Sequence, residues 1–214
     1  MNVRVAAWPG LLLGLAVAAW AQPPSASVTE ALSLPRDAAR GKAVYEACAS
    51  CHRDDGGGRA SGEMPLLAGQ HAEVTIRHLI DVRDGRRINP DMKQALIDEP
   101  QTPQSIADVA QYLQELPPSP RAVRGPGSHL EQGRKLFERD CAECHGAQAQ
   151  GDARSFSPAM AGQNYPFLWR ELNLIQRGMR GASDAAMRRV LQRYSPEELH
   201  ALADHLSHLP APAR

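Results

Sequence analysis

The sequence predicts an all-α protein made of two homologous halves. Apolar residues recur with helical spacing in both halves, and no segment reads as a strand. Matching residues in the two halves are separated by a constant interval, which indicates an internal duplication. The 214 residues are enough for two small domains.

The repeat is most evident around the cysteines. Residues 41–52 (GKAVYEACASCH) return as residues 133–145 (GRKLFERDCAECH), with one residue inserted before the cysteines. Beyond that insertion the interval is 93 residues (145 minus 52) and holds for His52 and His145, Pro65 and Pro158, Gln70 and Gln163, and Pro103 and Pro196. An interval held over this length divides the chain into two domains.

Each half is predicted to contain three principal helices. The expected segments are 38–47, 72–83 and a helix beginning at Pro103 in the first half, and 130–139, 165–176 and a helix beginning at Pro196 in the second. The last helix of each half starts with Thr-Pro or Ser-Pro, a capping residue followed by proline at the first helical position. Glu198, three residues after Ser195, completes a capping box.

The start of the chain has the pattern of an export signal. Arg4 supplies a positive charge, residues 11–19 are apolar, and Ala19-Trp20-Ala21 is a small-x-small cleavage site. Cleavage makes residues 1–21 a signal peptide and places the protein in the periplasm. A retained membrane anchor is the alternative, but proline and glycine interrupt the run, which is marginal against the ~20 residues needed to span.

A segment rich in proline and glycine separates the halves. We place the first domain at residues 22–118, the linker at 119–128 and the second domain at 129–214. Residues 22–118 carry a net charge of −4 and residues 119–214 one of +3, and the whole chain is neutral, which argues against nucleic-acid binding. Five arginines near Met187 are a candidate basic docking face: Arg177, Arg180, Arg188, Arg189 and Arg193. An ordinary solvated helix face is the alternative.

Each half contains one Cys-x-x-Cys-His sequence, which is the attachment sequence of c-type haem. The two thiols bond to one edge of the ring, and the histidine next to them ligates the iron. The predicted attachment residues are Cys48, Cys51, Cys141 and Cys144, and the predicted proximal iron ligands are His52 and His145. The sequence therefore predicts two covalently attached haem c groups.

Other uses of paired cysteines fit less well. A zinc site would need both pairs to converge on one metal, whereas the repeat supplies a full set to each half. A thioredoxin-like redox pair would need a βαβ context. Two disulfide staples would leave the histidine after each pair without a role.

A methionine in each half is a candidate for the sixth iron ligand. Met92 lies 40 residues after His52, and Met187 lies 42 after His145, and a short loop separates each methionine from the final helix of its half. A thioether opposite histidine raises the reduction potential of haem iron, which suits electron transfer. Simple core filling is the alternative reading of a methionine. It is preferred for the unmatched methionines Met64, Met160 and Met179, although Met179 competes with Met187.

With these motifs the chain resembles the cytochrome c4 family, dihaem proteins made of tandem class I cytochrome c domains. The matching segments include both Cys-x-x-Cys-His motifs, PLLAGQH at 65–71, NPDM at 89–92 and PAMAGQ at 158–163. The resemblance implies that Met92 and Met187 are the distal ligands.

The resemblance also implies local contacts. The carbonyls of Pro65 and Pro158 are expected to bond the second ring nitrogen of their histidines. Gly41 and Tyr45 are expected to pack across the last helix near Tyr112. His205 stands where an aromatic residue is usual, and residues 54–58 read as an ordinary surface loop.

The function that follows is a periplasmic electron carrier, not an enzyme, working between respiratory-chain partners. The resemblance implies a donor such as a quinol-oxidising complex or a dehydrogenase, and an acceptor such as a terminal oxidase. Association with the membrane surface stays open. One alternative is a haem subunit of a larger dehydrogenase. Another is an enzyme: peroxidase chemistry needs an accessible iron, and thiosulfate oxidation with cysteine ligation needs a cysteine beyond the four in the motifs.

Overall fold

The computed structural model describes residues 24–59, 61, 63–98 and 101–211. The predicted signal peptide lies outside these residues. The helices are α1 (Ala26–Ser33), α2 (Ala38–His52), α3 (Ala72–Arg83), α4 (Pro90–Asp98), α5 (Pro103–Glu115), α6 (Leu130–Asp140), α7 (Ala142–His145), α8 (Tyr165–Gln176), α9 (Ala185–Leu191) and α10 (Pro196–His208). Two isolated β-bridges are the only strand-like pairings in the described part of the chain. The all-α prediction is confirmed.

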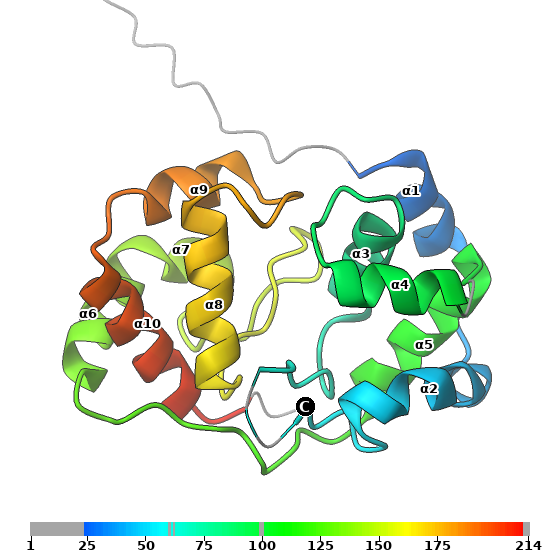
Figure 1. The fold of residues 1–214 in the computed structure, drawn as a ribbon, viewed down its shortest axis with the longest axis horizontal. Coiled ribbons are helices and arrows are strands. Elements are labelled where there is room, and N and C mark those ends of the chain that lie inside the picture. The colour runs from blue at the N-terminus through cyan, green and yellow to red at the C-terminus, as the bar shows by residue number, and fades with distance from the viewer. Residues whose placement is uncertain (1–23, 60, 62, 99–100, 212–214) are drawn as a thin grey trace, which may run out of the picture.

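The two halves lie side by side (Figure 1). The first half contains α1 to α5, and the second contains α6 to α10. Helices α2, α3, α4 and α5 have their counterparts in α6 with α7, α8, α9 and α10, whereas α1 belongs to the first half alone. Within the described helices, none is both long and apolar enough to cross a membrane.

Each half is built on a close crossing of its first repeated helix with its last. In the first half α2 crosses α5, and a side-chain β-carbon on Gly41 would stand only 2.0 Å from the backbone oxygen of Asp108. In the second half α6 crosses α10, and one on Gly133 would stand 2.0 Å from the oxygen of Ala201. Glycine is therefore required at both crossings, because any side chain would push the helices apart.

Aromatic rings close each crossing. The rings of Tyr45 and Tyr112 lie 5.4 Å apart, as the resemblance implied. In the second half Phe137 faces His205 at 6.0 Å, so the histidine occupies the aromatic position and packs there.

The predicted helices differ from the observed ones mainly near the cysteines and the methionines. The segments at 72–83 and 165–176 form α3 and α8 as predicted, and Ser195 caps α10 with the expected capping box. However, α2 continues through the first cysteine motif to His52. The two candidate methionines stand on the short helices α4 and α9, which were not among the predicted segments.

The glycine segment at 54–58 is not an ordinary surface loop. Gly56, Gly57 and Gly58 are buried. Gly58 has φ of +65°, and a β-carbon there would stand 2.6 Å from the oxygen of Met64. Gly151, 93 residues later, has φ of +76° and is equally crowded by Ser157. The sequence pattern missed this because a run of glycine and aspartate reads as polar and exposed.

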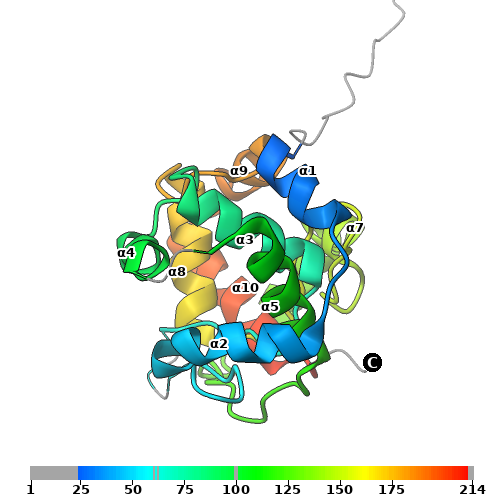
Figure 2. The ribbon, with the colours of Figure 1, turned by 90° about the vertical axis from the view of Figure 1, so that its right-hand side faces the viewer.

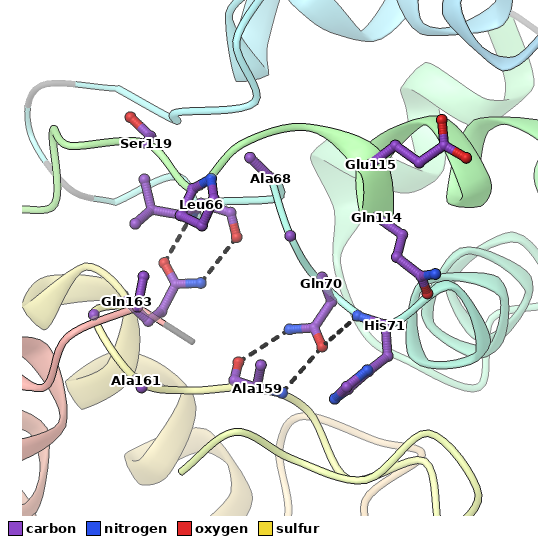
Figure 3. A pocket seen from close by; sticks show the side chains of 14 residues that line it. Leu66, Ala68, Gln70, His71, Gln114, Glu115, Ser119, Ala159, Ala161 and Gln163 are labelled. Atoms are coloured by element: carbon purple, nitrogen blue, oxygen red, sulfur yellow. Dashed lines mark hydrogen bonds between the residues drawn. The ribbon is translucent and has the colours of Figure 1, made fainter. Parts of the chain in front are cut away.

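Two glutamines join the halves in a reciprocal way (Figure 3). The side chain of Gln163 accepts from the Leu66 amide at 2.8 Å and donates to the Leu66 carbonyl at 2.9 Å. The side chain of Gln70 accepts from the Ala159 amide at 3.0 Å and donates to the Ala159 carbonyl at 3.0 Å. Leu66 and Ala159 are themselves 93 residues apart, so the two sets of bonds are related by the internal repeat. We call these four residues the glutamine clasp.

Candidate haem-binding sites

The first cysteine motif forms the end of α2. Cys48 and Cys51 lie one helical turn apart, and His52 follows as the last helical residue. Residues three and four apart on a helix share one face, so the two sulfurs and the imidazole are presented together. Both thiols are free.

The first half brings its predicted iron ligands together. The imidazole Nε2 of His52 stands 3.5 Å from the sulfur of Met92 on α4. His52 itself is buried. Helix α4 buries none of its residues and lies at the edge of the first half in Figure 2. Met92 is therefore the residue by which α4 reaches the proximal histidine.

In the second half, the contact that orients the histidine is made by its other ring nitrogen, Nδ1. Cys141 caps the short helix α7, which carries Cys144 and His145, and both thiols are free. The Nδ1 atom of His145 lies 3.4 Å from the carbonyl oxygen of Pro158, as the resemblance implied. The equivalent atom of His52 is buried and has no partner among the described residues, so the predicted carbonyl bond from Pro65 is not formed.

The structure separates the two candidate ligands of the second iron. Met187 is partly buried and packs against the second core, as does Met160. Met179 is 56% exposed. No hydrogen-bonding contact joins His145 to Met187 in the described chain. The second histidine and methionine are therefore not in the direct contact that His52 and Met92 make. The exposure of Met179 favours Met187.

Burial keeps both imidazoles neutral. Burial, together with the smaller effect of the nearby charge of Arg59, lowers the pKa of His52 to about 4. Burial also lowers the pKa of His145, which the Pro158 carbonyl partly offsets. A neutral imidazole has the free ring nitrogen that a metal requires.

These residues fit a covalently bound haem. The first half presents two free thiols and a buried, neutral histidine at the end of one helix, and the second half presents the same set on α7 and on the residue that precedes it. In the first half, the only buried side-chain nitrogen or oxygen without a partner in the described chain is a ring nitrogen of that histidine. The donor set of imidazole nitrogen and thioether sulfur suits haem iron. Cys48, Cys51, Cys141 and Cys144 would hold the haems, with iron bound by His52 and Met92 and by His145 and Met187.

A cavity lies elsewhere, at the junction of the halves (Figure 3). It has a volume of about 440 Å³, and both glutamines of the clasp line it. None of the candidate cysteines, histidines or methionines of the haem sites lines it.

Sequence reasoning missed a charged cluster between the halves. Glu171 on α8 bonds both Arg87, at 2.9 Å, and Arg180, at 2.8 Å. Arg180 also approaches His78 on α3 at 3.3 Å. The repeat could have indicated this cluster, because Arg87 and Arg180 occupy equivalent positions 93 residues apart, and so do His78 and Glu171. Arg180 is consequently not part of an exposed docking face.

Comparison with known proteins gives a consistent result. The cytochrome c family model matches residues 38–117 and again residues 130–210. The thiosulfate dehydrogenase electron acceptor of Stutzerimonas stutzeri is 31% identical over 201 residues, covering 83% of this chain and 90% of the relative. Cytochrome c4 of Pseudomonas aeruginosa is 28% identical over 182 residues, covering 81% and 89%.

A solved structure agrees with the fold. Reduced recombinant cytochrome c4 from Pseudomonas stutzeri superposes with a TM-score of 0.74 at 24% identity, covering 82% of this chain and all of that one. Two tandem helical domains are thus common to both.

Proposed function

Because the chain belongs to the cytochrome c family, in two tandem domains that each bind one covalent haem c, we propose that it is a periplasmic carrier with histidine and methionine at both irons. The chain transfers electrons and is not itself an enzyme. When bound, haem would supply one-electron redox chemistry at its iron. The histidine and methionine of each half would hold the iron and tune its potential.

One observation carries the ligand assignment. The imidazole of His52 and the sulfur of Met92 come from different helices and meet at 3.5 Å. A methionine that only filled core space would be expected to lie among apolar side chains rather than against a ring nitrogen. For the second iron we propose Met187, and its place on the equivalent helix and its partial burial support this choice.

The domain limits at 22–118, 119–128 and 129–214 remain our proposal. Helix α1 supports an early start, because Val28 and Ala31 are buried in the first core although they precede the matched region. The linker packs on the second domain, where Gly125 and Gly127 donate to Ser207 and Asp204.

Replacing either ligand methionine tests the proposal. The oxidised protein is expected to show the weak far-red absorption of ferric haem bound by thioether sulfur. Met92→Ala and Met187→Ala are each expected to remove about half of it and to lower the potential of one haem, because thioether ligation raises that potential. Optical redox titration measures both effects.

Met179→Ala is the matched control and is expected to leave both haems unchanged. If Met179→Ala abolishes the band of one haem and Met187→Ala does not, the second assignment is wrong. If protein matured in a host competent for haem attachment carries no haem, the function itself is refuted.

Its partners are redox proteins, and we propose a negatively charged surface as the feature that this chain recognises. Arg177, Arg188 and Arg189 are exposed near Met187. Arg193 is also exposed but is paired with Asp140. Opposite charges steer redox partners together and mainly accelerate association.

Reversing two of these charges tests the docking face. Arg188→Glu with Arg189→Glu is expected to slow reduction or oxidation by an acidic redox protein about tenfold at low salt, with the difference vanishing at high salt. Arg154→Glu, at an exposed site in the same half, is the control. Stopped-flow kinetics decide the matter, and equal rates for the double variant and the control would eliminate this face.

A second candidate function is supported by the relative from Stutzerimonas stutzeri, named as the electron acceptor of thiosulfate dehydrogenase. By analogy, this chain would be the haem subunit of a dehydrogenase complex. Native mass measurement of the protein isolated from the periplasm distinguishes a stable complex from a free carrier. The same fractionation tests the periplasmic location.

A further inference from the structure

Asp140, the residue before the second cysteine motif, is bound by three side chains. Its carboxylate accepts a hydrogen bond from the Tyr194 hydroxyl and pairs with Arg139 at 2.8 Å and Arg193 at 3.2 Å. The bond from Tyr194 and the charge of Arg139 lower the pKa of Asp140. Burial raises the pKa of Tyr194 to about 12, so the phenol keeps its proton and donates to an ionised acid. Such charge-assisted bonds are stronger than neutral ones.

The bond between Asp140 and Tyr194 joins two sides of the second candidate site. Asp140 is the last residue of α6 and adjoins Cys141. Tyr194 is buried in the turn that follows α9, the helix that carries Met187. Its amide donates to the carbonyl of Leu191, the fully buried last residue of α9, at 3.1 Å. This turn lies on the side of the second half that is remote from the first half (Figure 1).

The internal repeat shows that this bond is an addition to the second half. The backbone of the turn is held alike in both halves. Gln176 donates to the Tyr194 carbonyl at 2.8 Å, and Arg83, 93 residues before Gln176, donates to the carbonyl of Gln101, the equivalent of Tyr194, at 3.5 Å. The residue before the first motif, however, is Ala47, and its methyl group can form no hydrogen bond.

The second half also differs in the helix that carries its cysteine motif. Helix α2 runs without a break through the first motif to His52. Helix α6 ends at Asp140, and the second motif continues on α7, which has only four residues. So short a helix has little stability of its own. A strong bond at the break therefore fixes the motif relative to α9.

We propose that Asp140 is a positioning residue for the second haem, because through Tyr194 it holds α9, and with it Met187, against the attachment motif. This inference rests on the proposed ligation of the second iron by Met187. Without the bond, the turn after α9 is held less firmly, so an added ligand displaces the thioether more readily. Ala47 offers no such bond, so the first haem is not affected.

Competition by imidazole tests the proposal. Imidazole that replaces the thioether on ferric haem removes the far-red band. In a Met92→Ala background this band belongs to the second haem alone. Asp140→Ala and Tyr194→Phe are each expected to raise the imidazole affinity of that haem about tenfold, as loss of one charge-assisted hydrogen bond allows. Tyr194→Phe removes only a hydroxyl and keeps the ring in the core. Asp140→Asn keeps an acceptor oxygen and is expected to give a smaller rise.

Two controls separate positioning from general destabilisation. Glu138→Ala removes the same charge from the same helix, where Glu138 pairs with Arg134 at the surface, and is expected to change nothing. In a Met187→Ala background the band reports the first haem alone, and Asp140→Ala is expected to leave its imidazole affinity unchanged. Because the two partners share one bond, Asp140→Ala with Tyr194→Phe is expected to act no more strongly than either substitution alone.

The outcomes distinguish this inference from the proposed function. Haem content is measured first. Unchanged affinity in both Asp140→Ala and Tyr194→Phe, or an equal rise at both haems, would overturn the positioning role and leave the carrier function intact. Loss of the second haem from both variants would show a role in attachment and would overturn it too. A far-red band undiminished by Met187→Ala would refute the ligand assignment, and this inference with it.

Discussion

Gly41→Ala and Gly133→Ala are each expected to destabilise the haem-loaded protein by about 2 kcal/mol. Helix propensity alone predicts the opposite sign, because alanine is better than glycine in a helix interior by about 1 kcal/mol. The packing effect is larger: the added carbon would stand 2.0 Å from a backbone oxygen of the crossing helix. Backbone cannot rotate away as a side chain can, so this contact is expected to cost about 3 kcal/mol, the upper end of the usual range for overpacking.

Thermal or denaturant unfolding followed by circular dichroism measures this effect. Lys42→Ala, exposed on the same helix as Gly41, is the matched control and is expected to stay within about 0.5 kcal/mol of the native protein. A Gly41→Ala protein more stable than the native one would show that α2 does not cross α5 at the distance described.

Gln70→Ala and Gln163→Ala are expected to loosen the junction of the two halves. Each variant removes two hydrogen bonds and leaves a part-buried amide and carbonyl without their partner, a loss of about 1 to 3 kcal/mol. The structure predicts a crossed pattern of hydrogen exchange. Gln163→Ala should accelerate exchange at the Leu66 amide, in the other half, and Gln70→Ala should accelerate exchange at the Ala159 amide.

Mass-spectrometric or NMR hydrogen exchange on the haem-loaded protein detects this crossing. Gln111→Ala is a suitable control, because its side chain donates to Glu115 on the same helix, and no other side-chain bond of Gln111 is formed within the described residues. If each substitution alters exchange only within its own half, the reciprocal clasp does not exist in solution.

Much of the architecture follows from local sequence signals. The cap residues Ser195 and Glu198 bond the backbone next to them in the chain, so the start of α10 is decided within four residues. The same holds for the apolar spacing that defines α3 and α8. Helices α4 and α9 escaped prediction because they are short and bury little of their surface, leaving almost no apolar periodicity to read.

Some of the candidate haem residues could likewise be predicted from the sequence, whereas other features of the sites needed the structure. The Cys-x-x-Cys-His motifs are contiguous in the chain, so haem attachment can be predicted without knowing the fold. The choice of Met92 rested on its position in the repeat, and the structure adds its approach to His52 from another helix. The burial of Gly56 and Gly58 could not be recognised, because the residues that crowd them, Ala68 and Met64, lie later in the chain.

By itself, the sequence determined the duplication and the helical class and predicted the two sets of haem-attachment residues, because each depends on neighbouring residues or on a constant interval. Only the tertiary structure decided how the halves meet. The bonds of Gln70 and Gln163 and the sharing of Glu171 by Arg87 and Arg180 join positions on opposite sides of the repeat. Their partners depend on the docking of two folded domains, and no local pattern encodes a contact that exists only after docking.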